Sequence, residues 1–370
     1  MWGRQYFCLA LILALAWGPA AAIAGDPDYA LERKKFRQAE QALVQGQRTR
    51  FHALLAELKH YPLYPYLRYR ELRRYLSRAT AQEIAAFLDE YGDTPMAPRL
   101  RRAWLQRLAK RKRWREYLIF YTPQSRAALQ CNYHRALLET GQTREALEGI
   151  EALWLVGKSQ HAACDPVFRA WRKAGGLSRK LVWQRIGLAM AKRNRSLARY
   201  LSRYLPKQDL RFVRPWIEVD RNPALVTRHP RLREDSPQAR DILVHGIRRL
   251  MRTSLDRAAR AWDTLKVRYA FSTEQRATVE GQLALRYALQ GRPQALERLA
   301  ALDLSRNEDE SLREWRIRVA LKLKDWEAVL TWVEHLPEAE REEPRWRYWR
   351  ARALEALGNN EAREEFEALA

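Results

Sequence analysis

Tyrosine is concentrated in one short part of the chain, and its ring can stack on a sugar or on a nucleic-acid base. The stretch HYPLYPYLRYRELRRYL, residues 60–76, places five tyrosines and two prolines in seventeen positions. Such rings could form a sugar-binding platform or a base-stacking surface. They could also pack between helices, with Pro62 and Pro65 in a first turn, where a backbone donor is dispensable. Packing is the favoured interpretation, and Tyr64 and Tyr66 are the residues that would test it.

The first residues have the pattern of a cleaved secretory signal, which decides the chemistry open to the cysteines. Residues 1–24 contain Arg4, the apolar core YFCLALILALAW and an A-x-A site before Gly25. The apolar core is about twelve residues long, short of the roughly twenty that span a bilayer. We therefore expect an exported chain without stable membrane insertion after cleavage. Cys8 leaves with the signal.

Export places the remaining cysteines, Cys131 and Cys164, in an oxidising environment where thiols tend to pair. A bond between them would close a loop of about 33 residues and stabilise the fold by roughly 3 to 4 kcal/mol. Two buried free thiols are the alternative. Neither cysteine belongs to a CxxC pair, and the seven histidines show no metal-ligand spacing. The sequence predicts no metal site and no cofactor.

The chain is strongly basic, which indicates acidic partners. Its net charge is +24, and removal of Arg4 with the signal leaves +23. Such a field attracts polyanions, and nucleic acid would be the first candidate for a cytosolic protein. Export changes the candidates: in a bacterial envelope they are peptidoglycan with its peptide carboxylates, teichoic acids or lipopolysaccharide, and membrane phospholipid. Alternatively, many arginines only form solvated helix faces, as in residues 101–118, beside an apolar stripe of Trp104, Leu105 and Leu108.

An all-α fold is predicted to position these residues. Leu, Ala, Arg and Glu dominate, and Gly and Pro are sparse, which is typical of helical chains. Amphipathic stretches alternate with short connectors: KRKRW, TGQTRE, AKRNRS, LQGRPQ, KLKDWE and LGNNEA. In the second of these, Gly141 suits a left-handed helix cap. Helical hairpins of this kind stack into a TPR-like α-solenoid. Prolines interrupt the helical pattern between residues 205 and 236, where short helices between turns are expected. A domain linker is the weaker alternative there.

Three segments resemble the N-terminal part of soluble lytic murein transglycosylases. They are YPLYPYLRYREL, the block at residues 130–171 that runs from QCNY through WLVGKSQ to ACDP, and residues 343–366. The resemblance implies a U-shaped or ring-forming α-superhelix that precedes a linker domain and a lysozyme-like catalytic domain. In that family the whole enzyme cleaves the MurNAc-GlcNAc bond of peptidoglycan and leaves a 1,6-anhydromuramoyl end.

The catalytic segments of that family are not expected here. Its acid is a Glu in an E-S motif, followed by G-L-M-Q and A-Y-N-A-G segments. Glu310 and Ser311 spell E-S, but neither companion segment follows them. Glycoside cleavage also needs a carboxylic acid kept protonated in an apolar pocket, and the acidic residues here lie mainly among arginines. Glu310 is therefore interpreted as a solvated or capping residue, and no catalytic residue is assigned.

The resulting prediction is a periplasmic, non-catalytic superhelical domain over residues 25–370, without the linker and catalytic domains. It would hold a catalytic domain, contact glycan strands in the Gram-negative envelope, and be inactive alone. The alternative is a free-standing TPR-like scaffold that binds another envelope protein. A nucleic-acid partner is not expected.

Overall fold

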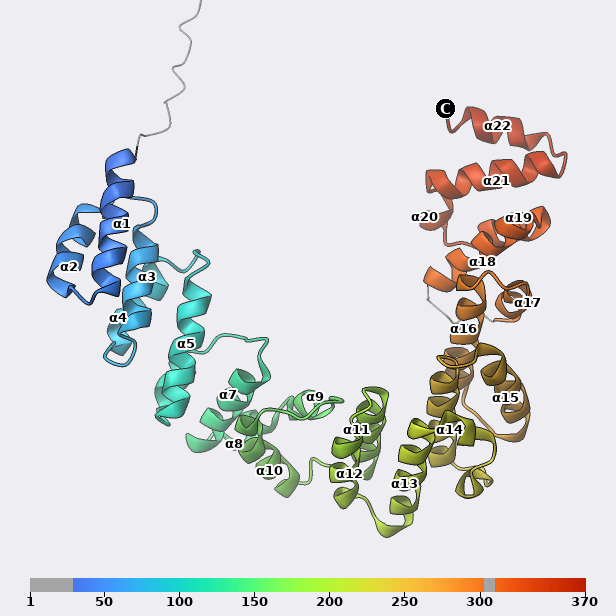
Figure 1. Cartoon of the computed structure of the whole chain (residues 1–370), viewed down its shortest axis with the longest axis horizontal. Coiled ribbons are helices and arrows are strands. Elements are labelled where there is room, and N and C mark those ends of the chain that lie inside the picture. The colour runs from blue at the N-terminus through green and yellow to red at the C-terminus, as the bar shows by residue number, and fades with distance from the viewer. Residues whose placement is uncertain (1–28, 303–309) are drawn as a thin grey trace, which may run out of the picture. The chain divides into compact units, whose positions relative to one another are not determined.

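The computed structural model describes residues 29–302 and 310–370, in which every regular element is a helix (Figure 1). The all-α class is therefore confirmed. This described part of the chain divides into two compact units, one that ends at Gln142 and one that begins at Thr143. The predicted signal at residues 1–24 lies outside the described residues.

The first unit is a series of helices that pack on their neighbours in sequence. Its helices are α1 (Ala30–Val44), α2 (Arg48–Glu57), α3 (Tyr64–Arg74), α4 (Ala81–Glu90), α5 (Ala97–Lys110), α6 (Trp114–Phe120) and α7 (Ala127–Glu139). Helix α1 packs on α2 and α6 on α7. The apolar stripe predicted in residues 101–118 is buried, with Trp104 and Leu105 in the core between α4 and α7. The arginines of that segment lie around this apolar face.

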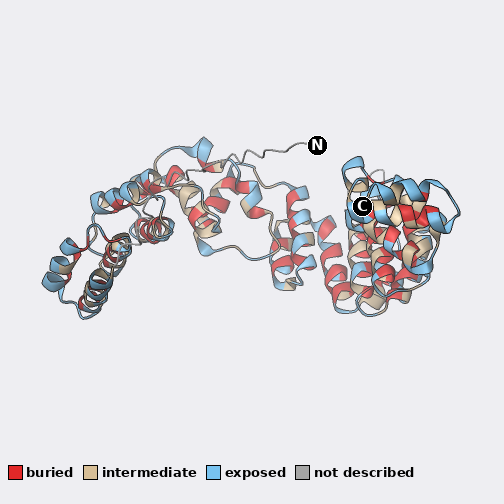
Figure 2. Cartoon of the chain, turned by 90° about the horizontal axis from the view of Figure 1, so that it is seen from above, coloured by how far each residue is buried: buried red, intermediate tan, exposed pale blue. Residues whose placement is uncertain are grey.

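The second unit is also a series of helices that pack on their neighbours in sequence, and it contains more of them. Its first half contains α8 (Thr143–Leu147), α9 (Ile150–Trp154), η1 (Ala162–Cys164), α10 (Asp165–Lys173), α11 (Arg179–Ala191), α12 (Arg195–Leu201), η2 (Ser202–Tyr204), α13 (Lys207–Arg221), η3 (Pro223–Thr227) and η4 (Pro230–Leu232). Its second half contains α14 (Pro237–Leu250), α15 (Leu255–Arg268), α16 (Thr273–Leu289), α17 (Gln294–Ala300), α18 (Glu310–Leu323), α19 (Trp326–Glu334), α20 (Glu338–Arg341), α21 (Pro344–Ala356) and α22 (Glu361–Glu367). Buried residues occur along the helices of both units, as the red parts of the ribbon mark (Figure 2).

A left-handed residue is present in each connector that the sequence predicted. Glycine takes this conformation at Gly141, Gly291 and Gly358, and an ordinary residue takes it at Lys112, Arg193 and Lys324. The amide of the next residue then donates a hydrogen bond to the carbonyl oxygen five residues earlier in the chain. Examples are Gln142 to Leu137 O and Asp325 to Ala320 O. This bond satisfies a carbonyl that the helix end leaves without a partner. The same turn therefore closes helix after helix.

The proline-containing region differs from the prediction in one respect. Helix α13 runs through Pro215 for 15 residues, although an interruption was expected there. Proline removes one backbone donor, but Phe212, Trp216 and Val219 are buried beside it and hold the helix in place. The short helices η3 and η4 follow, as expected between turns.

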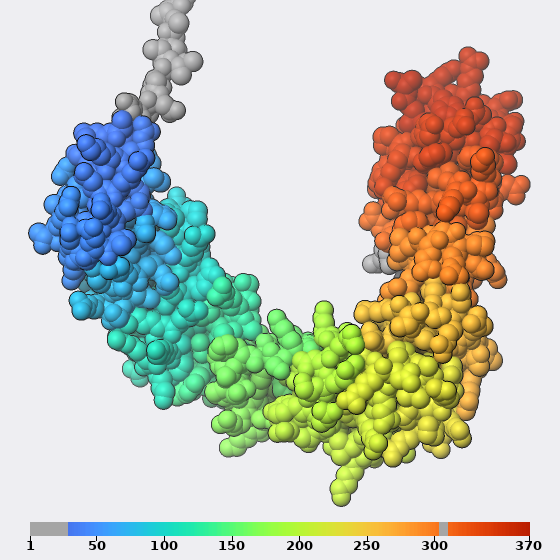
Figure 3. All heavy atoms as spheres, viewed as in Figure 1, coloured from blue at the N-terminus to red at the C-terminus, as the bar shows by residue number. Residues whose placement is uncertain are grey.

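In the space-filling view, consecutive stretches of each unit lie beside one another in sequence order (Figure 3). This arrangement is that of stacked helical hairpins, as predicted. The U-shaped or ring-forming path of the whole chain stays a prediction. None of the helices within the described ranges has the length and apolar character of a membrane span.

Candidate functional site

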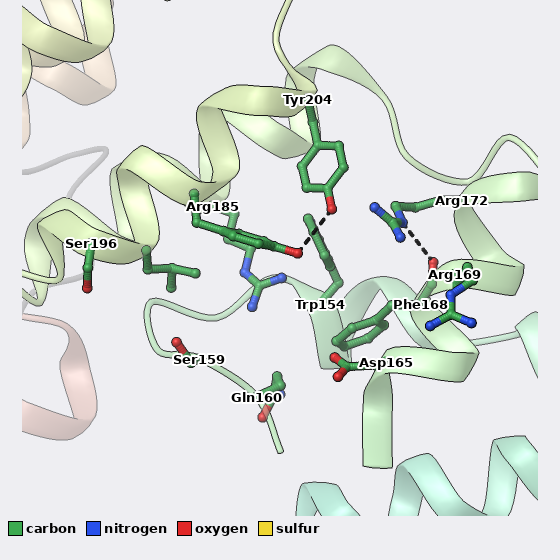
Figure 4. Close-up of a pocket in the computed structure, with 12 residues that line it drawn as sticks. Trp154, Ser159, Gln160, Asp165, Phe168, Arg169, Arg172, Arg185, Ser196 and Tyr204 are labelled. Carbon is green, nitrogen blue, oxygen red and sulfur yellow. Dashed lines mark hydrogen bonds between the residues drawn. The ribbon is translucent and has the colours of Figure 1, made fainter. Parts of the chain in front are cut away.

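A pocket in the second unit gathers cationic and aromatic side chains from several helices (Figure 4). Its volume is about 520 Å³. Helices α9 to α12 and η2 supply most of its walls, and the segment between α9 and η1 supplies the polar side chains of Ser159 and Gln160. This segment belongs to the WLVGKSQ stretch that the sequence analysis singled out.

Close backbone packing holds that segment against α11. A Cβ atom on Gly157 would lie 2.3 Å from the carbonyl oxygen of Leu188, so only glycine allows this approach. The side-chain amide of Gln160 donates to Leu153 O at 2.6 Å, and His161 Nδ1 accepts from the amide of Ala163 at 3.0 Å. The wall of the pocket is therefore fixed at both ends.

Arg185 lines this pocket and is only 3% exposed. Its Nε donates to Val156 O at 3.2 Å and its Nη2 to Lys158 O at 3.4 Å. The guanidinium carbon lies 4.0 Å from the ring centroid of Trp154, a cation–π contact. Burial lowers the pKa of Arg185 to about 10, which still leaves the side chain cationic at neutral pH.

Aromatic rings form the rest of the wall. Trp154 meets Phe168 edge to face at 5.3 Å, and the hydroxyls of Tyr200 and Tyr204 are 3.2 Å apart. Burial, and then the hydrogen bond to Tyr200, raise the pKa of Tyr204, so the phenol is neutral under physiological conditions. Arg172 lies 4.8 Å from the centre of the Tyr204 ring, and its Nε donates to Phe168 O at 3.2 Å.

The charges around the pocket do not balance. Arg169, Arg172 and Arg185 line it, whereas Asp165 is the acidic residue among its lining side chains. Within the described ranges, none of the three arginines forms an ion pair with a carboxylate. Asp165 is exposed, unlike the enclosed acid that glycoside cleavage requires. The arrangement is suited to binding an anion and offers no acid–base pair for catalysis.

A carboxyl with a raised pKa lies elsewhere, in α14. Burial raises the pKa of Asp241, although hydrogen bonds from its partners oppose the shift. Trp183 Nε1 donates to one oxygen at 2.7 Å and Gln275 Nε2 to the other at 2.8 Å. Both oxygens are thus used to join α11, α14 and α16, which is a structural role.

None of the candidate site residues named from the sequence, Glu310, Cys131 and Cys164, is among the residues that line this pocket. Glu310 is exposed at the start of α18, where a negative carboxylate interacts favourably with the positive end of the helix dipole. Cys131 in α7 and Cys164 in η1 are both fully buried and disulfide-bonded, and their pairing with one another stays a proposal. No cluster of metal-ligating side chains occurs among the residues that the structure describes.

The tyrosine stretch is mainly packed, as predicted. Helix α3 begins at Tyr64 with Pro65 in its first turn. Tyr61 is buried, while Tyr64 and Tyr75 pack against the core of α1 to α3. Tyr66 is 37% exposed and lies 6.3 Å from Phe36, ring to ring. These contacts are those of helix packing rather than of an open platform.

Sequence reasoning did not identify the pocket residues Trp154, Arg185 and Tyr204. The available signals were the spacing of Phe168, Arg169 and Arg172 within FRAWR and of the tyrosines in RYLSRY. Each pattern also fits an ordinary helix with a solvated face, so neither would have been decisive.

Comparison with curated proteins finds soluble lytic murein transglycosylases. The chain is 31% identical over 338 residues to that of Escherichia coli strain K12 and 30% identical over 341 residues to that of Salmonella typhimurium. These matches cover 90% and 91% of this chain, but 52% and 53% of the relatives. The chain therefore spans about half the length of the curated relatives it matches.

Solved structures give the same result. The fold matches an inactive mutant of the lytic transglycosylase Slt from Pseudomonas aeruginosa with a TM-score of 0.82 and 33% identity, over 91% of this chain and 55% of that one. The 70-kDa soluble lytic transglycosylase from Escherichia coli matches with a TM-score of 0.74 and 30% identity, over 91% of this chain and 55% of that one. A family model described as Cucumovirus coat protein matches residues 123–215, a small part of the chain, and carries no assignment.

Proposed function

Because the chain is homologous to the N-terminal part of the soluble lytic murein transglycosylases, we propose that it is a non-catalytic, superhelical portion of such an enzyme. The complete family enzyme cleaves the MurNAc-GlcNAc bond of peptidoglycan in cell-wall turnover. This portion holds a catalytic domain and presents a basic surface to glycan strands. The observation that carries the proposal is a match over nine-tenths of this chain to about half of its relatives.

The chemistry of the described residues supports a binding role rather than a lytic one. The pocket around Arg185 offers positive charge and aromatic rings without an enclosed acid. Glu310 is exposed at a helix start, unlike the enclosed acid that glycoside cleavage requires. The net charge of +24 adds a field that attracts the carboxylates of peptidoglycan.

The proposal also places the protein in the periplasm. Buried, disulfide-bonded cysteines support an oxidising compartment, and the murein transglycosylase relatives act on a substrate of the cell envelope.

Purified sacculi incubated with the protein test this function. We expect the protein to sediment with the sacculi and to release no anhydromuropeptides. Release that persists after repurification and disappears in Glu310→Gln would contradict the non-catalytic assignment. Failure to sediment at low ionic strength would contradict the binding role.

A further inference from the structure

The Arg185 guanidinium is a buried cation that forms no ion pair with a carboxylate of residues 29–302 or 310–370. Its hydrogen bonds go to two backbone carbonyls, those of Val156 and Lys158. Taking a charge out of water is costly unless an opposite charge or several hydrogen bonds compensate it. A guanidinium presents five N–H donors, so donors remain for a ligand.

A second unsatisfied group lies beside the same pocket. The indole Nε1 of Trp154 is buried and has no hydrogen-bond partner within the part of the chain that the structure describes. Buried indole N–H groups usually find an acceptor. An anionic ligand would supply the negative charge that Arg185 lacks, whereas the Trp154 nitrogen has almost no accessible surface and is closed off from the pocket. The uncompensated charge of Arg185, beside Arg169 and Arg172, therefore indicates an anionic occupant.

We propose that this pocket binds a carboxylate-bearing muramyl peptide, with Arg185 as donor to the ligand carboxylate. Arg169 and Arg172 at the walls add positive charge, and Ser159, Gln160 and Ser196 add uncharged polar groups suited to hydroxyls and amides. The assignment of the ligand to peptidoglycan rests on the proposed function. The anion-binding character of the pocket rests on its own geometry.

The size of the pocket limits the ligand to a fragment. A cavity of about 520 Å³ falls within the usual range for small-molecule sites. It suits one sugar with a short peptide rather than a folded protein. The aromatic wall of Trp154, Phe168 and Tyr204 provides the apolar faces on which the ring or the side chains of such a ligand can pack. The site would therefore bind the acidic peptide that is attached to a glycan strand.

Calorimetric titration with muramyl dipeptide, whose peptide ends in a free carboxylate, tests this proposal on the full chain. We expect saturable binding and a raised unfolding temperature, because a ligand that binds only the native state stabilises it. The carboxamide form of the same compound should bind at least about tenfold more weakly, since a charge-assisted hydrogen bond is lost. Equal binding of acid and amide, or tighter binding of inorganic phosphate than of muramyl dipeptide, would overturn the assignment.

Variants locate the binding. Arg185→Gln and Arg169→Gln should each weaken the binding of muramyl dipeptide, the former by about tenfold or more. Arg228→Gln removes the same charge from an exposed position outside the pocket and should bind like the parent. Arg169 is also exposed, so its variant remains informative if Arg185→Gln does not fold. Unchanged affinity in a folded Arg185→Gln protein would refute the proposal.

Sedimentation with sacculi keeps this proposal distinct from the broader function. Binding to sacculi depends on the combined charge of many arginines. It should therefore persist in both pocket variants, even when they no longer bind muramyl dipeptide. If the parent protein does not bind sacculi, the broader proposed function is wrong. If it binds sacculi but not muramyl dipeptide, only the assignment of the pocket is wrong.

Discussion

The carboxylate of Asp220 in α13 accepts a hydrogen bond of 2.6 Å from Nε of Arg195 in α12. Asp220 is fully buried, and its other oxygen lies 3.0 Å from His245 Nε2 and 3.3 Å from Arg249 Nε. Although burial alone would raise the pKa of Asp220, hydrogen bonds from Arg195 and His245 bring it below the ordinary value. One ionised carboxylate thus joins three successive helices of the solenoid.

Removing that carboxylate should strongly destabilise the second unit. In Asp220→Ala, Arg195 and Arg249 keep their charges but lose their shared partner. Breaking a buried ion pair in this way costs about 3 to 5 kcal/mol. Denaturant unfolding should show the loss, whereas Glu148→Ala, which removes an exposed partner of Arg144, should change little. Similar stabilities of the two variants would contradict the structural role of Asp220.

His245 makes the stability of this unit depend on pH. Burial lowers the pKa of His245, and the arginines at 248 and 249 act in the same direction, whereas the hydrogen bond with Asp220 opposes them. Below the ordinary histidine pKa of about 6.5, the unfolded chain therefore binds a proton that the folded chain binds less readily. The free energy of unfolding should fall as pH decreases from about 7 to 5. A shallower fall in His245→Gln is expected in thermal unfolding, and an unchanged slope would be evidence against this contribution.

The connectors allow a paired test of backbone strain. Lys324 and Gly358 both have φ near +56° to +75° and close equivalent turns. Lys324→Gly should stabilise the fold by up to about 1 kcal/mol, because a left-handed conformation is unfavourable for a residue with a Cβ atom. Gly358→Ala should destabilise it by about the same amount, since no atom lies within 4 Å of the added Cβ and strain alone acts. Chemical denaturation measures both, and shifts of equal sign would reject this explanation.

The cysteines are expected to form one bridge in the exported protein. Intact mass should increase by two hydrogens on reduction, and a peptide map should join the Cys131 and Cys164 peptides. Reduction should lower stability by roughly 3 to 4 kcal/mol, because a closed loop of about 33 residues restricts the unfolded chain. Two free thiols in freshly purified periplasmic material would contradict the pairing.

The helical fold could be predicted from sequence because its signals are local. Apolar spacing indicated the buried face of α5, and each short connector between amphipathic stretches proved to contain the left-handed residue that ends a helix. Pro215 was misjudged for a physical reason. Local propensity disfavours proline within a helix, but the burial of Trp216 and its neighbours outweighs the lost hydrogen bond.

The pocket could not be predicted because it depends on distant residues. Trp154, Arg185 and Tyr204 come from different elements, and each could also occur in an ordinary helix of a basic protein. The sequence carries no mark of which arginine is buried without a carboxylate. That property arises only when α9, α11 and η2 pack together.

Co-sedimentation with purified sacculi across a salt series tests most directly whether this chain is a peptidoglycan-binding, non-catalytic portion. The net charge of +23 that remains after removal of the signal should give weak attachment at about 0.1 M salt that is lost toward about 1 M, as the Debye length shortens from roughly 10 Å to 3 Å. Tyr64→Ala and Tyr66→Ala should bind like the parent at equal folded concentration, because these rings pack in the fold. Absence of binding at low salt would contradict the account, as would binding that is unchanged at 1 M salt and lost in either tyrosine variant.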